Sequence, residues 1–129
     1  MIEHNEISRT PLDGIRVGAY IPDQPTRDNL VTRNVVTGAG NDGISMAATE
    51  GPVGVTTVTL NAVTGADGDG IHVGSLAVSG AVTLAGNRTV RNGQYGIEAV
   101  VAVRDGGGNV ASGNRAGAQC TGVLCRPAA

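Results

Sequence analysis

Polar residues that could do chemistry recur on both sides of a repeated Gly-Ile dipeptide. Four directly follow the dipeptide: Arg16, Ser45, His72 and Glu98. Four directly precede it: Asp13, Asp42, Asp69 and Tyr95. If the copies lie in register, these residues form one strip with acids, a base, a phenol and a guanidinium. A histidine beside a glutamate can act as a base with an orienting partner, and neighbouring carboxylates share a cation or raise one pKa.

The register of that strip depends on a longer repeat, in which an Asn precedes each Gly-Ile pair by nine residues. The four copies begin at Asn5, Asn34, Asn61 and Asn87, so they are spaced by 29, 27 and 26 residues. Constant spacing inside the repeat and variable spacing between repeats indicate stacked coils, in which aligned positions superimpose and loops vary.

The aligned positions predict how each coil is stabilised. Asn side chains about 4.8 Å apart can hydrogen-bond along the stack as an Asn ladder. Gly suits a tight corner, and the following Ile15, Ile44, Ile71 and Ile97 are expected to point inward, with Val17, Met46, Val73 and Ala99 two residues further on. A fifth, shorter coil is predicted from Asn109, and its Asn114 matches Asn92.

The chain between these positions contains strand-like stretches separated by turns. Examples of predicted strands are residues 14–19, 43–47, 55–60, 70–74, 81–84 and 96–103. Turns are predicted at residues 38–41, 65–68, 91–93 and 105–108. Two proline-containing segments, residues 19–29 and 47–54, are expected to project as loops. No stretch shows helical periodicity with capping residues.

Composition is consistent with thin stacked layers. The 129 residues include 21 Gly and neither Phe nor Trp, so the core must consist of aliphatic side chains. A net charge of −2 predicts no binding to nucleic acid or to anionic membranes. No apolar run is long enough to span a membrane, and no signal peptide is expected before the first repeat.

The two cysteines, Cys120 and Cys125, lie close together near the end. This spacing fits a small disulfide-closed loop, whereas a metal site would lack further ligands. Two reduced thiols are the alternative. A disulfide would indicate an oxidising compartment.

The segment Asn87-x4-Asn92-Gly93-x2-Gly96-Ile97 closely matches a known repeat. It resembles the N-x4-N-G-x2-G-I repeat of the right-handed parallel β-helix family, the pectate-lyase-like carbohydrate-binding and sugar-hydrolysis proteins. Looser copies begin at Asn5, Asn34 and Asn61, and the resemblance covers roughly residues 4 to 118. Residues 109–125 also resemble the closing segment of secreted bacterial members, which implies a secreted or cell-surface protein.

The resemblance implies an all-β fold, a right-handed single-stranded parallel β-helix of about five coils over residues 1–118, followed by a C-terminal loop over residues 119–129. It also implies that an extended, acidic polysaccharide lies along the outer face of one sheet. Candidate catalytic residues are then His72, Glu98, Asp69 and Tyr95. Candidate substrate-binding residues are Arg16, Ser45 and Asp42.

The activity itself stays open, because motifs typical of such enzymes are absent. The chain has no Asp-Pro-His-Asp, Gly-His-Gly or Arg-Ile-Lys sequence. Arg16 and Tyr95 are three coils apart, about 14 Å, so both cannot touch one scissile bond. If the protein is an enzyme, the resemblance implies a lyase, a glycoside hydrolase or an epimerase. A solvated outer face without catalysis is the alternative for the strip.

Two glycine-rich turns resemble calcium-binding nonapeptides. Residues 38–44 locally resemble the G-G-x-G-[ND]-D-x-[IL] pattern, and residues 65–71 are a looser copy. The resemblance implies a Ca²⁺ site at Asp42, Asp67 and Asp69, with plain turn chemistry as the alternative. No cofactor other than Ca²⁺ is suggested.

The runner-up function is a structural solenoid without activity, or a piece of a longer one. β-Helices usually cover their first coil, because an uncovered coil exposes apolar side chains and unpaired strand edges. Residues 1–3 are too short to form such a cap. We therefore expect either upstream coils or self-association through this end.

Overall fold

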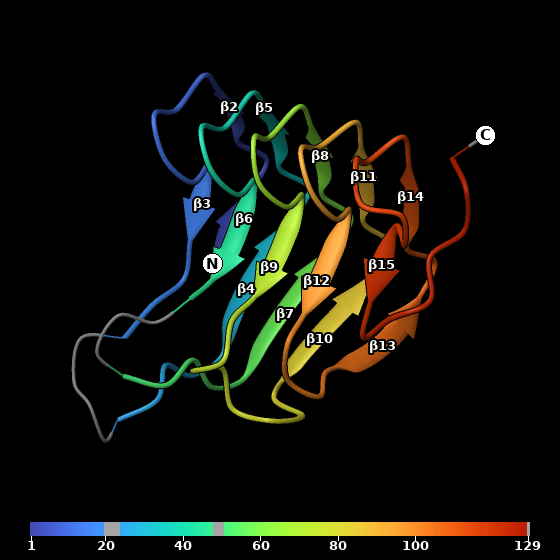
Figure 1. Ribbon diagram of the computed structural model, residues 1–129. Helices are drawn as coiled ribbons and strands as arrows, with labels where there is room; N and C mark the ends of the chain where they lie inside the picture. The colour runs from blue at the N-terminus through green and yellow to red at the C-terminus, as the bar shows by residue number, and fades with distance from the viewer. Residues whose placement is uncertain (20–23, 48–50, 129) are drawn as a thin grey trace.

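The computed structural model describes residues 1–19, 24–47 and 51–128. These residues form fifteen short strands and no helix (Figure 1). All strand pairs inside the three sheets are parallel. The prediction of a parallel β-helix, or β-solenoid, is therefore confirmed.

Each coil contributes one strand to each of three five-stranded sheets. Sheet A contains β1 (Ile2–Glu3), β4 (Asn29–Thr32), β7 (Thr56–Thr59), β10 (Val82–Ala85) and β13 (Arg104–Gly107). Sheet B contains β2 (Glu6–Ser8), β5 (Val35–Thr37), β8 (Ala62–Thr64), β11 (Arg88–Val90) and β14 (Val110–Ser112). Sheet C contains β3 (Ile15–Arg16), β6 (Ile44–Met46), β9 (Ile71–Val73), β12 (Ile97–Ala99) and β15 (Cys120–Thr121).

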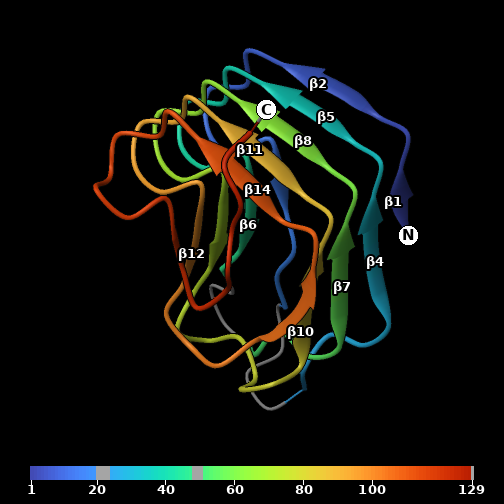
Figure 2. The same ribbon diagram turned by 90° about the vertical axis from the view of Figure 1, so that its right-hand side faces the viewer.

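The three sheets extend side by side along the stack of coils. Sheet C faces the viewer in Figure 1, and sheets A and B are seen in Figure 2. From the first to the fifth strand of a sheet, the chain makes about four turns. This is slightly fewer than the five coils predicted, because five stacked strands are separated by only four complete turns.

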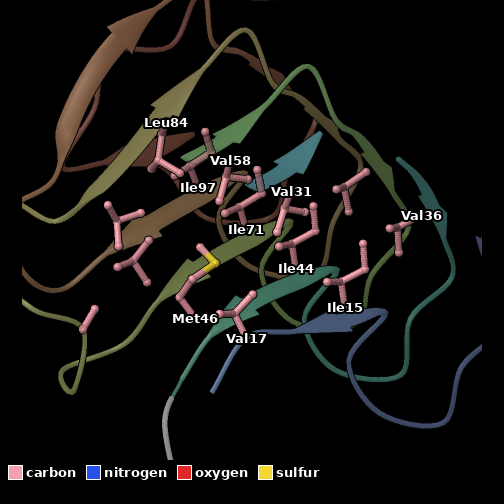
Figure 3. Close-up of a cluster of buried hydrophobic side chains, with 14 of the residues drawn as sticks. Ile15, Val17, Val31, Val36, Ile44, Met46, Val58, Ile71, Leu84 and Ile97 are labelled. Atoms are coloured by element: carbon pink, nitrogen blue, oxygen red, sulfur yellow. The ribbon is translucent and has the colours of Figure 1, made fainter. Parts of the chain in front are cut away.

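The interior is an aliphatic stack, as the repeat predicts. Ile44, Ile71 and Ile97 are fully buried in register on sheet C, and Ile15 is 5% exposed (Figure 3). The second predicted column is also buried at Val17, Met46 and Val73, whereas Ala99 is half-buried. Inner residues of sheets A and B, such as Val58 and Val63, fill the rest of the core. β-Branched side chains suit this geometry because they pack against neighbours on a pleated surface.

The Asn ladder is present along the whole stack. The Nδ2 of Asn5, Asn34, Asn61 and Asn87 each donates to the Oδ1 of the next ladder Asn, at 3.0 to 3.1 Å, and the series ends at Asn109. The same Oδ1 atoms accept the backbone N–H of the preceding ladder residue. A second, shorter ladder joins Asn92 to Asn114 at 2.9 Å and Asn114 to Gln119 at 2.9 Å.

The Gly of each Gly-Ile pair is required by close packing between coils. A Cβ atom on Gly70 would lie 2.6 Å from the Gly96 carbonyl oxygen and 2.9 Å from the Thr89 Cβ. On Gly43 it would lie 2.6 Å from the Gly70 oxygen. Glycine is therefore needed at this corner because the next coil leaves no room for a side chain.

Two predicted strands and one predicted turn differ from the structure. Of residues 14–19, only Ile15–Arg16 form a strand, β3. Residues 105–108 were predicted as a turn and residues 96–103 as a strand, but β12 ends at Ala99 and β13 occupies Arg104–Gly107. Local glycines favour a turn, yet parallel pairing with β10 extends this segment. The register shifts between Leu84 and Ala85, and Gly107 has φ 82°, so a bulge accommodates the glycines.

The two projecting segments contact each other where the structure describes them. The Gly51 amide donates to the Ala19 carbonyl at 3.1 Å, and the Thr26 amide donates to the Pro52 carbonyl at 3.1 Å. The central parts of both predicted loops, residues 20–23 and 48–50, lie outside the described residues.

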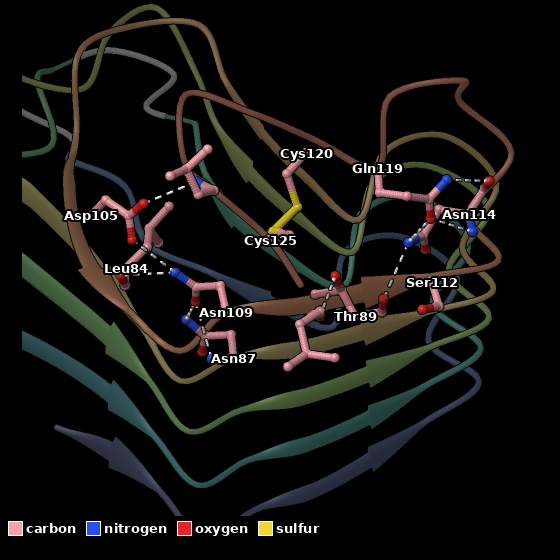
Figure 4. The surroundings of a disulfide bond; sticks show 12 residues. Leu84, Asn87, Thr89, Asp105, Asn109, Ser112, Asn114, Gln119, Cys120 and Cys125 are labelled. Carbon is pink, nitrogen blue, oxygen red and sulfur yellow. Dashed lines mark hydrogen bonds between the residues drawn. A yellow bond between two sulfur atoms is a disulfide. The ribbon is translucent and has the colours of Figure 1, made fainter. Parts of the chain in front are cut away.

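The C-terminal segment folds back over the last coil and contains a disulfide bond between Cys120 and Cys125 (Figure 4). Val123 between them is 9% exposed and belongs to the core cluster. The disulfide alternative is therefore the one found. In the described part of the chain, no helix is long and apolar enough to cross a membrane.

Candidate functional site

The strip expected from the repeat is one continuous column on sheet C. Arg16 pairs in register with Ser45, Ser45 with His72, and His72 with Glu98. The column continues to Thr121 of β15. Because residues on one side of a parallel sheet stack at one strand spacing, the prediction that His72 lies next to Glu98 is confirmed.

The aspartates before each Gly-Ile pair have a structural role that the sequence interpretation missed. One carboxylate oxygen, Oδ1, accepts the backbone N–H of the matching residue in the next coil. Asp13 accepts from Asp42 at 3.0 Å, Asp42 from Asp69 at 2.8 Å, and Asp69 from Tyr95 at 2.9 Å. The sequence carried part of the signal for this role, because the first three coils have an acid at this position and carboxylates readily bind turn amides. It did not show that the bound amide belongs to the next coil.

The second carboxylate oxygen binds the residue three positions later. Asp13 Oδ2 accepts from Arg16 Nε at 2.9 Å, and Asp69 Oδ2 lies 2.9 Å from His72 Nδ1. The side chains of Asp13 and Asp69 are only 3% and 4% exposed. In these two pairs, a ligand on this face therefore meets the outer side chains, Arg16, which is 50% exposed, and His72, which is 24% exposed.

Asp69, His72 and Glu98 form the tightest group of ionisable side chains on the strip. One oxygen or nitrogen atom from each lies within 4.8 Å of the other two. Among the described residues, this is the one such group of three His, Cys, Asp or Glu side chains. Asp69 lies two residues before β9, and His72 is the central residue of that strand. β12 places Glu98 opposite His72.

The shared environment shifts three pKa values in the same direction. The hydrogen bond to Asp69 raises the pKa of His72, assisted by the charges of Asp42, Asp69 and Glu98. Burial first, and then the Asp69 charge, raises the pKa of Glu98. Burial also raises the pKa of Asp42. His72, Glu98 and Asp42 therefore bind protons more readily than the same side chains in isolation.

Two other candidate residues are less accessible than the strip suggests. Ser45 is 1% exposed, and its in-register neighbours are the longer Arg16 and His72. Tyr95 is half-buried, and its backbone amide is bound to Asp69. Sequence alternation could assign Ser45 to the outer side of the sheet, but it could not show that its neighbours cover it.

The expected calcium ligands do not form a compact group. Asp42 and Asp69 are joined through a backbone amide, and Asp67 is exposed. A turn carbonyl that could ligate an ion, that of Asn41, already accepts the Gly68 amide at 2.9 Å. The Ca²⁺ site stays a prediction.

Comparison of the chain with protein-family models, with curated proteins and with solved structures found no match. The parallel β-solenoid is shown by the structure, and the relation to the pectate-lyase-like family stays a hypothesis based on the repeat.

Proposed function

We propose that this protein binds an extended acidic polysaccharide along the outer face of sheet C and acts on it with His72, Asp69 and Glu98. The observation that carries the proposal is the His72 ring, held by Asp69 at 2.9 Å and facing Glu98 on the neighbouring strand. An oriented imidazole beside a carboxyl group is a common acid–base arrangement. The disulfide bond supports an oxidising, extracellular setting for such a ligand.

The geometry supports distinct roles for the group. Asp69 holds His72 through Nδ1, which leaves Nε2 to take up a proton from a sugar carbon or from water. Burial and then the Asp69 charge raise the pKa of Glu98, and its place opposite His72 makes it the candidate proton donor to a leaving oxygen. Tyr95, which occupies the position of Asp69 in the next coil, is the alternative proton donor.

Arg16 supplies the positive charge that an acidic sugar chain requires. It is exposed and lies two strands from His72, about 10 Å away. It therefore neutralises a carboxylate on a sugar unit beside the reacting one. Asp42 lies between these positions, and the covered Ser45 acts as a spacer.

The test uses polygalacturonate and alginate as ligands. We expect both the melting temperature and direct binding by calorimetry to report an interaction that Arg16→Gln weakens about tenfold or more, by loss of a charge-assisted contact. Arg88→Gln, which removes an exposed arginine from sheet B, is the matched control. His72→Gln should keep binding and abolish formation of unsaturated or shortened products.

The absence of any melting shift with these ligands would contradict the proposal. In that case the structural solenoid becomes the better interpretation. One observation favours the structural solenoid. The aspartate Oδ1 atoms accept backbone amides of the next coil, as expected of groups that hold coils together.

A further inference from the structure

We propose that Asp69, His72 and Glu98 bind one divalent transition-metal ion, and that zinc is the ion they select over calcium. The inference does not rest on the polysaccharide proposal, because it concerns the metal alone and requires no sugar. It also differs from the predicted calcium site, since it replaces Asp42 and Asp67 with a nitrogen ligand and a carboxylate from the next strand.

The donor atoms have the right types for this class of ion. An imidazole nitrogen suits zinc and other first-row transition metals, whereas calcium prefers oxygen ligands in larger number. Three side-chain ligands with an open position are typical of zinc sites that hold water or substrate. The group offers one nitrogen and two carboxylates.

The distances also fit. Two ligands on one zinc ion, each about 2.1 Å from it, lie roughly 3 to 4 Å apart. His72 Nδ1 and Asp69 Oδ2 are 2.9 Å apart as a hydrogen-bonded pair, whose proton a bound ion would replace, and one candidate ligand atom from each of the three side chains lies within 4.8 Å of the other two. Rotation of the half-buried Glu98 side chain can bring its carboxylate closer to the other two ligand atoms.

The position is rigid and rich in negative charge. Asp69 is fixed because its other oxygen accepts the Tyr95 amide at 2.9 Å, and preorganised ligands favour metal binding. The matching place in the first coil shows the contrast. There, Asp13 binds Arg16, so the chain supplies its own cation. In the third coil, His72 Nδ1 donates a proton to Asp69, and a metal ion that displaces this proton gains a nitrogen ligand beside two carboxylates.

The experiment titrates the whole protein with zinc chloride, by calorimetry and by nuclear magnetic resonance of the histidine rings. The chain has two histidines, and His4 lies exposed beside Glu3 at 3.7 Å. We expect one zinc ion per chain and a shift of the His72 ring signals, with His4 unaffected. Arg16→Gln should leave zinc binding unchanged, which separates this test from that of the polysaccharide.

Variants then assign the ligands. His72→Gln and Glu98→Gln should each weaken zinc binding at least about tenfold, and both replace partly exposed side chains, so melting curves should confirm folding. His4→Gln is the matched control and should bind zinc normally. The proposal is overturned by no binding at millimolar zinc, by binding that depends on His4, or by calcium binding as tightly as zinc in a manner insensitive to His72→Gln.

Discussion

At the scale of single residues, the aspartate before each Gly-Ile pair serves two neighbours at once. In Asp13, Asp42 and Asp69, one oxygen holds the backbone of the next coil, and in Asp13 and Asp69 the other meets the side chain three positions later. The identity of that later residue then decides the local chemistry. In the first coil it is Arg16, whose Nε forms an ion pair with Asp13 while half of the side chain stays exposed, and in the third it is His72, which adds a titratable group beside Glu98.

The pairing of His72 with Asp69 predicts a pH-dependent stability. The pKa of His72 is raised in the folded state, so the stabilisation is complete below the unfolded value of about 6.5 and is lost as pH rises through the folded pKa. His72→Gln should therefore lower the free energy of unfolding at pH 5.5 and have little effect at pH 9. Urea unfolding at both pH values measures the difference.

The control for this prediction is His4→Gln, because His4 is 65% exposed and surface charges contribute little to stability. A loss of stability with His72→Gln that is equal at both pH values would show that the imidazole acts through packing rather than through its charge.

At the scale of the elements, the strands are short, and side-chain ladders join the turns between them. The strands have two to four residues each. Within the stack, Asn61 is 1% exposed, and its Nδ2 donates to both Asn87 and the Val31 carbonyl. Such buried amides are useful because they satisfy backbone groups that would otherwise lack a partner at the corner.

Asn61→Ala should lower the free energy of unfolding by about 3 kcal/mol or more. The change removes the acceptor of the buried Asn34 backbone N–H and a donor to the Val31 carbonyl, and each such loss costs about 1 to 3 kcal/mol. The Asn34 side-chain amide also loses one of its two partners and keeps the other, the Ile2 carbonyl. Urea unfolding measures the loss.

Asn5→Ala provides the comparison at the exposed end of the same ladder. We expect a loss of about 1 kcal/mol or less there, because water can replace the missing partner. Equal losses at Asn5 and Asn61 would mean that burial does not determine the strength of the ladder.

At the scale of the whole molecule, a stack of coils must cover the apolar interior at its last turn. Here the segment after β15 does so. The Arg126 amide and carbonyl bond to Asn109 and Ala111 of the last coil, and the Leu124 amide donates to Asp105. The disulfide closes this segment into a small loop around the buried Val123.

Replacing both Cys120 and Cys125 with Ser should lower the free energy of unfolding by about 2 kcal/mol, the chain-entropy estimate for so short a loop. Thermal and urea unfolding measure the loss, and reduction of the unmodified protein should reproduce it. An unchanged stability would indicate that the Val123 packing and the backbone contacts hold the segment without the bond.

The sequence alone determined which residues stack on which. The constant spacing from each ladder Asn to its Gly-Ile pair set the Ile44 and Ile71 column, the Asn34 and Asn61 pair and the register of His72 with Glu98. A repeat can specify these because neighbouring coils place equal positions at equal heights, whatever the loops between them do.

Only the tertiary structure decided which side chains of the strip are exposed and which atoms are already hydrogen-bonded. The burial of Ser45, the binding of the aspartate oxygens to amides of the next coil and the pairing of β13 with β10 depend on contacts between coils. Local residue types cannot report them, because covering a side chain or occupying a lone pair requires atoms more than twenty residues away in the chain. Asp69 and Glu98 are also more than twenty residues apart, and only the folded stack brings their carboxylates close to each other and to His72.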